Sequence, residues 1–392
     1  MHKPTLLMES DSPGLRLSYL MARNFTNDDE RFMARALALA ARGQGYVEPN
    51  PMVGCVIVRG GRIVGEGYHR RFGGPHAEVH ALQAAGPRAK GATVYVTLEP
   101  CAHHGKTPPC VDALVAAGVK RVFAAMRDPF GKVCGRGFRR LRAAGIDVRV
   151  GLHERQARLL NAPYMMLHRA GRPWVILKWA QSLDGRIATQ TGDSQWISSP
   201  QSRRRAHQLR GRVDAVVVGV NTVLADNPRL DCRMAKPKRI ASRVVLDPTL
   251  RTPLSAYLVR TAKQVPLLIV TSPSSVRTAK ADILRLHGAE LVPVRKRGHG
   301  LDLPRLLQEL GRRGMTNIMI EGGGKTLGLF HDAGLADEVV AFICPRLIGG
   351  RGAPSPLNGC GPAKISESPI IGNWTAARSG PDYRFRLVLH EP

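Results

Sequence analysis

The chain has 392 residues, a length that suits two domains of ordinary size better than one core. Its apolar content of 43% is normal for a globular protein. No apolar run approaches the roughly eighteen residues that cross a membrane, so we expect no membrane partner. The seven cysteines, an odd number in a long chain, do not indicate a disulfide framework and favour a reducing, cytoplasmic setting.

The formal net charge of +28 raises the question of a nucleic-acid partner, because lysine and arginine neutralise phosphates. The positive residues are scattered, with short clusters at 203–205 and 295–297, and aromatic residues that could stack on bases make up 5%. We therefore expect no nucleic-acid partner and interpret the charge as arginine on solvated surfaces. Such a field would still attract phosphorylated small molecules.

Residues 1–27 carry no periodic pattern that a core requires. They include Glu9 and Asp11 and have no long apolar stretch, so a secretory signal is not expected. We predict a disordered tail or an over-long start, with Met21 as an alternative start.

Two successive patterns of strands and helices follow, joined by a linker at 153–172. In the first domain, 28–152, we expect helices at 28–42, 76–85, 110–117 and 137–144, and strands at 53–58, 62–69, 92–97, 121–125 and 148–150. In the second domain, 173–392, we expect strands at 174–179, 215–220, 243–246, 267–270, 318–320 and 338–343, and helices near 202–210, 279–286, 303–312 and 326–332. Alternation of this kind indicates α/β layered domains.

The most informative motif of the first domain is a histidine followed by two cysteines: His76, Cys101 and Cys110. One imidazole and two thiolates make three protein ligands for zinc, and a catalytic zinc keeps a fourth position for water. His76 and Cys110 both stand where helices are expected to begin. Because a helix N-terminus stabilises a thiolate, we expect Cys110 to ionise easily.

Glu78 lies two positions past the histidine, at the open end of the same helix. A carboxylate there can take a proton from the activated water and deliver it to the ring nitrogen and the leaving ammonia. This arrangement is typical of zinc deaminases. A structural zinc site would have four protein ligands; His103 and His104 could be read as further ligands, but their Gly- and Pro-rich loop favours substrate contact or solvent exposure.

The eight residues between the cysteines distinguish this chain from many nucleoside and nucleic-acid deaminases, which have two. The stretches NPMVG at 50–54, PHAEVHAL at 75–82 and TLEPCAHHGKTPPC at 97–110 resemble the bacterial riboflavin-biosynthesis deaminase/reductase family. The resemblance implies zinc at His76, Cys101 and Cys110, Glu78 as proton shuttle, Asn50 on the substrate and Lys106 on its phosphate. Phe130 departs from the family pattern.

In the second domain, the sequence EGGGKTL at 321–327 follows an expected strand and opens an expected helix. Glycines let a backbone approach a phosphate closely, and a helix N-terminus favours its charge. The glycines are explained equally well by tight packing of the turn without a bound phosphate. The spacing matches neither a Rossmann nor a Walker motif.

The stretches KWAQSLDGRIA at 178–188, SQWI at 194–197 and VGVNTVLADNP at 218–228 resemble the reductase half of the same family. That resemblance implies a cytidine-deaminase-like α/β/α domain followed by a dihydrofolate-reductase-like α/β domain that binds NADPH. The implied cofactor contacts are Ala180, Trp196, Thr222, Asp226, Gly323, Gly324, Lys325, Thr326, Leu327, Gly328 and Leu329. The implied substrate contacts are Ser194, Arg210, Leu230, Arg233 and Glu321, while Asp231 departs from the usual threonine.

The resemblance runs from about residue 28 to about 389 and implies a bifunctional enzyme. It would deaminate a phosphoribosylated aminopyrimidine and then reduce its ribosyl group, as a homo-oligomer. The alternative is a nucleic-acid editing deaminase whose basic second domain binds RNA. A non-catalytic zinc protein is disfavoured, because every catalytic position is filled.

Overall fold

The computed structural model describes residues 25–103, 108–131, 133–298 and 300–391. The described residues divide into two compact units: one contains 25–47 and Pro51–Asn161, the other Glu48–Asn50 and the residues from Ala162 onward. Expectations for residues 1–24 lie outside the described residues. Phe25 contacts the Phe123 ring, and Thr26 caps the first helix through the Asp29 amide. The folded unit therefore includes residues that we had assigned to the tail.

The first unit is a five-stranded sheet between helices, in the strand order β2-β1-β3-β4-β5. The β1 strand pairs antiparallel with β2 and β3, while β3, β4 and β5 run parallel. The strands are β1 (Gly54–Arg59), β2 (Arg62–Tyr68), β3 (Thr93–Val96), β4 (Arg121–Ala124) and β5 (Asp147–Val150). The helices are α2 (Asn27–Ala40), α3 (Ala77–Ala85), α4 (Cys110–Ala116), α5 (Arg136–Ala143) and α6 (Glu154–Leu160), with 3₁₀ turns η2 (Ala41–Gly43) and η3 (Gly86–Ala89).

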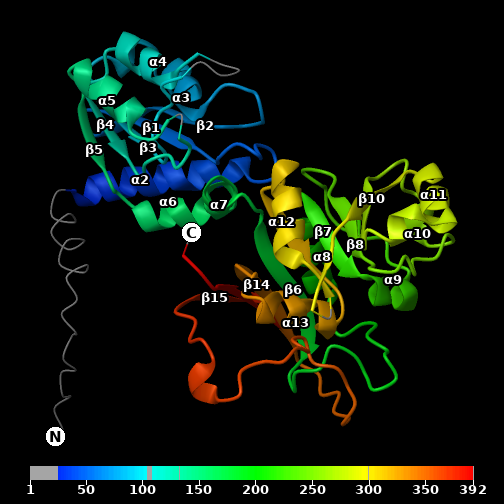
Figure 1. Ribbon diagram of the computed structural model, residues 1–392. Helices are drawn as coiled ribbons and strands as arrows, with labels where there is room; N and C mark the ends of the chain where they lie inside the picture. The colour runs from blue at the N-terminus through cyan, green and yellow to red at the C-terminus, as the bar shows by residue number, and fades with distance from the viewer. Residues whose placement is uncertain (1–24, 104–107, 132, 299, 392) are drawn as a thin grey trace, which may run out of the picture. The chain divides into compact units, whose positions relative to one another are not determined.

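Alternation along the strands of the first unit supplies both faces of its sheet with apolar side chains. Cys55 and Ile57 of β1 join the core with α3, α4 and α5, whose contributions include Ala81, Leu114 and Leu141. Aromatic residues of α2, β3 and β4 pack together on the other face: Phe32, Tyr95 and Phe123. The unit is an α/β/α sandwich (Figure 1).

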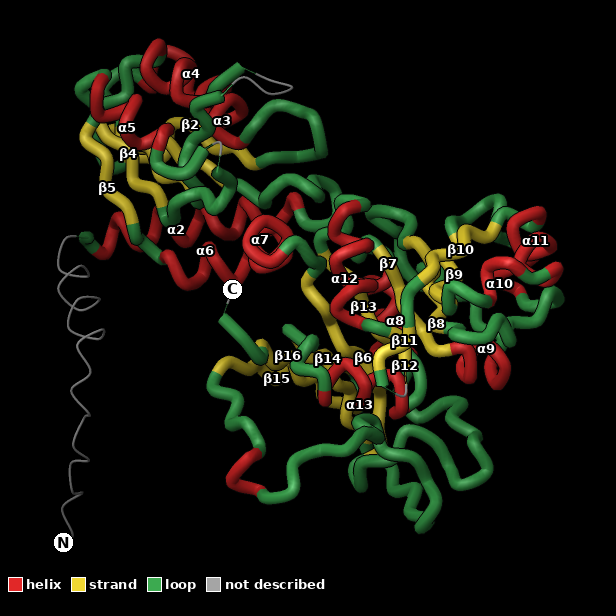
Figure 2. Tube along the Cα trace, viewed as in Figure 1, coloured by secondary structure: helices red, strands yellow, loops and turns green. Residues whose placement is uncertain are grey.

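The second unit is a nine-stranded sheet in the order β10-β9-β8-β7-β13-β6-β14-β16-β15. The strands from β10 to β14 are parallel, and β16 and β15 continue the sheet antiparallel. Figure 2 labels the strands of this sheet. They are β6 (Trp174–Ser182), β7 (Ala215–Gly219), β8 (Ser242–Leu246), β9 (Leu267–Thr271), β10 (Ala289–Pro293), β13 (Asn317–Ile320), β14 (Glu338–Cys344), β15 (Asn373–Ser379) and β16 (Asp382–Val388).

The remaining elements connect these strands. The helices are α7 (Ala162–Ala170), α8 (Pro200–Arg210), α9 (Val220–Asp226), α10 (Tyr257–Arg260), α11 (Ala279–Leu286), α12 (Leu303–Arg312) and α13 (Gly324–Asp332). A small hairpin, β11 (Lys296–Arg297) with β12 (Gly300–Leu301), and the 3₁₀ turns η4 (Ser275–Arg277) and η5 (Ile365–Glu367) complete the unit. No helix among the described residues is both long and apolar enough to cross a membrane.

The parallel arrangement brings the carboxyl ends of β6, β7, β8, β9 and β13 to one edge of the sheet. Ligands of open α/β sheets bind outside this edge. The glycine-rich turn follows β13 there, and α9 follows β7. This edge is therefore where a bound cofactor and substrate are expected in the second unit.

Candidate zinc centre and reductase site

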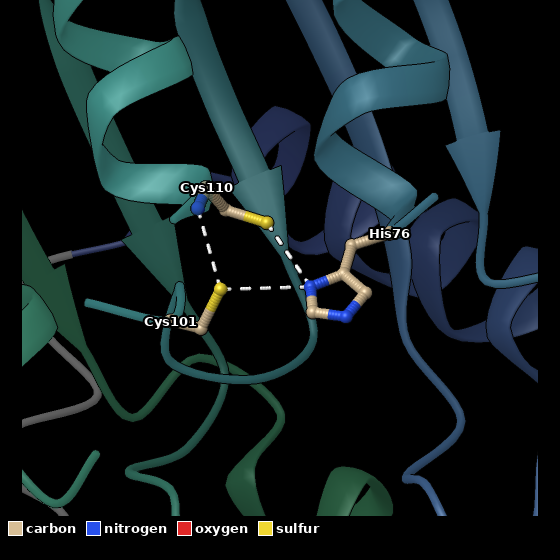
Figure 3. Close-up of side chains that lie close together, drawn as sticks. All are labelled: His76, Cys101 and Cys110. Carbon is tan, nitrogen blue, oxygen red and sulfur yellow. Dashed lines mark hydrogen bonds between the residues drawn. The ribbon is translucent and has the colours of Figure 1, made fainter. Parts of the chain in front are cut away.

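The three expected zinc ligands of the first unit come together (Figure 3). Their ligand atoms all lie within 4.8 Å of one another. His76 Nδ1 lies 3.2 Å from Cys110 Sγ and 3.5 Å from Cys101 Sγ. The backbone N–H of Cys110 donates to Cys101 Sγ at 3.3 Å.

The local structure explains why these residues meet. His76 is the N-cap of α3, and Cys110 is the first residue of α4. Gly65 and Gly67 let α3 lie directly on β2, since a Cβ there would stand 2.2 Å and 2.4 Å from carbonyl oxygens of that helix. Two helix N-termini thus converge on the loop that carries Cys101.

The spacing of this cluster fits zinc. Zn–N and Zn–S bonds of about 2.05 and 2.3 Å at tetrahedral angles place nitrogen and sulfur about 3.5 Å apart. The observed separations of 3.2 and 3.5 Å match that value. Three protein ligands leave a fourth position for water, which distinguishes a catalytic from a structural site.

The two thiols of the centre differ in acidity, and the expectation for Cys110 is corrected. The hydrogen bond from Cys110 lowers the pKa of Cys101 to about 4, whereas that same contact and burial raise the pKa of Cys110. Without metal the first proton therefore leaves from Cys101. The contact between the two sulfurs outweighs the helix N-terminus, because one proton is shared between them.

Glu78 lies in the first turn of α3 and is 3% exposed. Burial raises the pKa of its carboxyl to about 7, although His76 counteracts the shift. Among the described residues, its Oε2 has no hydrogen-bond partner. A buried carboxylate oxygen with a pKa near neutrality, beside the ligand cluster, has the properties of a general acid/base.

Glu99 is a residue of this site that sequence reasoning did not single out. Its buried carboxylate accepts hydrogen bonds from the backbone N–H groups of Asp128, Gly135 and Gly137 at 2.9–3.3 Å. It thereby ties the start of α5 to the segment that carries Cys101. The signal for it was a carboxylate directly before Pro100-Cys101, after a buried strand.

The loop between the cysteines is described only in part, and His104 and Lys106 lie outside the described residues. The ring of His103 contacts that of Phe130, with centroids 6.1 Å apart. His103 is not part of the ligand cluster. Asn50 belongs to the segment Glu48–Asn50, which groups with the second unit, so its role toward the deaminase substrate stays a prediction.

In the second unit, a buried carboxylate lies between two cations at the carboxyl edge of the sheet. Glu321 follows β13, and its Oε2 accepts from Arg210 at 2.8–2.9 Å. Lys178 Nζ of β6 lies 3.4 Å from Oε1. Burial opposes ionisation of Glu321, but Arg210 and Lys178 hold its pKa below the ordinary value.

Arg210 and Glu321, which the resemblance implies as substrate contacts, form an ion pair with each other, and Lys178, which the sequence did not mark, joins them. Its signal was an ionisable residue inside an otherwise apolar strand. The segment with Arg233 lies next to this site: Arg210 donates to the Asp231 carbonyl at 3.4 Å. The Asp231 carboxylate pairs with Arg229 at 2.9 Å and Arg233 at 2.8 Å, so this departure from threonine partly neutralises the arginines.

The glycine-rich turn differs from the expectation in one respect. Gly323 is the N-cap of α13, and a Cβ there would meet no other atom within 4 Å. At Gly324, however, a Cβ would lie 2.1 Å from the carbonyl oxygen of Ser355, and Gly328 is similarly close to Asn358. Gly324 and Gly328 are therefore required by packing against the segment 355–359, and Gly323 is the position open to a ligand.

The other expected contacts lie on the same half of the unit. Ala180 is on β6, Thr222 and Asp226 are on α9, and Leu230 is buried. Trp196 is 55% exposed, and the Arg203 guanidinium lies 4.5 Å from its ring centroid. Exposure leaves one aromatic surface available to a planar ligand.

Two family models match the chain. Residues 26–126 match the cytidine and deoxycytidylate deaminase zinc-binding region, and residues 173–377 match the RibD C-terminal domain. The riboflavin biosynthesis protein RibD of Aquifex aeolicus is 45% identical over 82% of this chain and 88% of its own length. That of Escherichia coli is 44% identical over 92% of this chain and 99% of its own.

Solved structures agree. Acinetobacter baumannii RibD (form 2) has a TM-score of 0.79 and 35% identity, covering 92% of this chain and 98% of that one. The deaminase/reductase of Thermotoga maritima has a TM-score of 0.79 and 33% identity, covering 93% and 99%. The expected fold class, a deaminase-type layered domain followed by a reductase-type α/β domain, is confirmed. With relatives 44% and 45% identical over 92% and 82% of the chain, and with residues 173–377 matching the RibD C-terminal domain, this chain belongs to the RibD family of riboflavin biosynthesis proteins.

Proposed function

We propose that this chain catalyses two consecutive steps of riboflavin biosynthesis. The first is zinc-dependent hydrolytic deamination of 2,5-diamino-6-(5-phosphoribosylamino)pyrimidin-4-one. The second is NADPH-dependent reduction of the ribosyl group to give 5-amino-6-(5-phosphoribitylamino)uracil. The observation that carries the proposal is the cluster of His76, Cys101 and Cys110 with buried Glu78 beside it, in a chain whose second unit matches the RibD C-terminal domain.

In the deaminase unit, His76, Cys101 and Cys110 would hold a zinc ion, which would supply an acidified water as nucleophile. Glu78 would accept one proton of that water and pass it to the ring nitrogen, and would then accept a second proton from the hydroxyl group on the attacked carbon and pass it to the departing ammonia. In the metal-free site, burial raises the pKa of this carboxyl, which favours the protonated form that a proton donor needs. Glu99 holds the loop and α5 in place, so that Cys101 stays in register with the other ligands.

In the reductase unit, NADPH supplies a hydride when bound. The ring-opened imine of the ribosylamine presents its former anomeric carbon as acceptor, so the protein must hold the two carbons in contact. Glu321, Arg210 and Lys178 position the polar substrate at the carboxyl edge of the sheet. Arg233 fits a phosphate, since its guanidinium is always charged and binds in two-pronged fashion.

The direct test measures both steps separately. With the aminopyrimidine alone, the purified chain should release ammonia; with NADPH added, it should also oxidise the cofactor. Removing metal with a chelator should abolish ammonia release but leave reduction of the already deaminated compound nearly unchanged, because the two sites belong to different units. Ammonia release that persists without metal would contradict the zinc mechanism.

The turn at Gly323 and Gly324 allows a matched pair of variants. Gly323→Ala adds a Cβ into open space, so the free energy of unfolding should change by less than about 0.5 kcal/mol. NADPH should bind about tenfold more weakly, because the Cβ blocks close approach of a phosphate to the backbone. Gly324→Ala overpacks against Ser355 and should cost about 1–3 kcal/mol of stability.

Thermal melting and titration with NADPH would separate these effects. Unchanged NADPH binding by Gly323→Ala would show that the pyrophosphate does not approach this turn. Equal stability of both variants would show that the packing of Gly324 is not tight.

The chain is also proposed to act as a homo-oligomer. Strand β15 is the edge of the larger sheet, and its residues from Trp374 to Arg378 are exposed on both faces. Ile365 and Ile370, in the segment before it, are 91% and 99% exposed. Unpaired edges and exposed apolar side chains favour association with another chain.

The remaining proposals concern partners, location and domain limits. The partner is a phosphorylated pyrimidine rather than nucleic acid, since the unit that would bind RNA in an editing enzyme matches a reductase model. All seven cysteines are free, which supports a reducing, cytoplasmic setting. We propose a deaminase domain from at least Phe25 through α6, a linker shortened from 153–172 to 162–172, and a reductase domain at 173–392; the support is that the residues up to Asn161 group with the first compact unit.

A further inference from the structure

The carboxyl edge of the larger sheet provides a path for a dinucleotide. Strands β13, β7, β8 and β9 are consecutive neighbours in the sheet. The glycine-rich turn follows β13, α9 follows β7, and the loop at 247–252 follows β8 (Figure 2). The segments that follow these strands therefore lie along the edge in the same order as the strands themselves.

Two contacts connect the turn to the loop after β8. A Cβ at Gly322 would stand 2.7 Å from Thr222 Oγ1, so the turn and the first residues of α9 touch. The neighbouring Asn221 accepts a hydrogen bond from Arg251 Nη2 through its side-chain oxygen, at 2.5 Å. Asn221, the partner of Arg251, directly precedes Thr222, which touches the turn, so Arg251 lies close to the turn. The loop of Arg251 follows β8, so this arginine lies on the side of β13 that faces away from β6.

The charge of Arg251 is not neutralised by a nearby acid. Its side chain is exposed and forms no ion pair with any described residue. The one acid of its loop, Asp247, is buried and accepts from the N–H groups of Arg251 and Thr252 and from the Thr252 hydroxyl at 2.7–2.9 Å. Asp247 shapes the loop and leaves the guanidinium available for an anion.

The direction of the cofactor follows from the position of the charged site. Glu321 directly follows β13, and its partner Lys178 belongs to β6, so the charged site where the substrate and the nicotinamide must meet extends to the β6 side of β13. With the pyrophosphate at the turn after β13, the adenosine half extends the opposite way, over β7 and β8. Its ribose then comes to the loop that carries Arg251.

We propose that Arg251 binds the 2′-phosphate of NADPH and so selects NADPH over NADH. The inference rests on the proposed NADPH-dependent reductase. A guanidinium suits this group because its planar donors match two phosphate oxygens. The Asn221 bond holds the side chain beside the ribose, which a freely rotating surface arginine would not achieve.

The test compares Arg251→Gln with Arg260→Gln. Arg260 is another exposed arginine, at the end of α10, and its side chain forms no hydrogen bond or ion pair with any described residue. Equilibrium titration of the whole chain with NADPH and with NADH gives the dissociation constants without turnover. Losing a charge-assisted bond should weaken NADPH binding about 10- to 100-fold in Arg251→Gln and leave NADH binding within about twofold.

Fragments of the dinucleotide test the contribution of the 2′-phosphate separately from the rest of the cofactor. Calorimetric titration should show that 2′,5′-ADP loses affinity for Arg251→Gln while ADP does not, and Arg260→Gln should behave as wild type with both. Arg251→Lys should restore part of the affinity, since it keeps the charge but not the fork.

The outcomes are distinct. Equal losses for NADPH and NADH would mean that Arg251 only supports α9 through Asn221, and would overturn the inference. An unchanged NADPH constant would overturn it as well. If the wild-type chain bound neither dinucleotide while still releasing ammonia, the proposed reductase function itself would fail, and this inference with it.

Discussion

Replacing Glu78 by glutamine is expected to reduce deamination by about 10²–10⁴-fold, the usual effect of losing a general acid/base. Glutamine has nearly the same shape, so the 3% exposed position should remain filled and α3 intact. The three ligands are untouched, and the zinc content should stay at one per chain. Reduction of already deaminated substrate should be nearly normal, because that site belongs to the other unit.

Ammonia release, metal analysis and NADPH oxidation measure these three properties on the same sample. Glu66→Gln is the matched control, since Glu66 is a carboxylate of the same unit that forms a surface ion pair with Arg35. Such pairs contribute little, so deamination should be unchanged. Deamination by Glu78→Gln at the wild-type rate would remove Glu78 from the mechanism.

Glu321→Gln is expected to unfold the second unit more easily and to stop reduction. The substitution leaves Arg210 and Lys178, whose side chains are 17% and 15% exposed, without their buried partner, and the cost should approach, as an upper limit, the roughly 3–5 kcal/mol of a broken buried ion pair. Chemical denaturation followed by a probe in the second unit measures the free energy of unfolding. Glu290→Gln, which removes an exposed partner of Arg313, should cost less than about 1 kcal/mol.

The effect of Glu321 also has a defined pH dependence. Its pKa in the folded chain is held below the ordinary value of about 4.3, so its stabilisation is fully present above that value. The stabilisation is lost as the pH falls through the folded pKa. The difference between wild type and Glu321→Gln should therefore shrink in acid; a difference that stays constant from pH 7 into the acid range would show that the carboxylate does not act through its charge.

The zinc centre could be predicted from the sequence because its ligands belong to short local motifs. His76 and Glu78 share one helix turn, and Pro100-Cys101 and Cys110 bracket one loop. The acidity of the two thiols could not be predicted, since it depends on a contact between sulfurs from different segments. Glu99 escaped notice for the same reason: its three backbone donors lie 29–38 positions further along the chain.

In the reductase site, by contrast, the main contacts join distant segments and could not be predicted from local motifs. Arg210 and Glu321, 111 positions apart, were paired only through resemblance, and Lys178 became visible when β6 was placed beside β13. Strands β15 and β16 were not predicted because most of their side chains are exposed or half-buried, so neither strand forms an apolar run in the sequence. Gly324 was read as a phosphate contact because no local pattern shows that the segment after residue 354 packs against it.

The order of strands in the larger sheet also has a consequence for synthesis on the ribosome. Both neighbours of β6, which are β13 and β14, follow it by about 140 residues or more. At about 5–20 residues per second, the interval before β13 is made lasts roughly 7–28 s. By then all strands of the first unit have been synthesised and can pair with one another, since that unit ends before β6 begins. If translation stalled before residue 317, the nascent chain would therefore contain a complete deaminase unit followed by the apolar strand β6, which would lack both of its neighbouring strands.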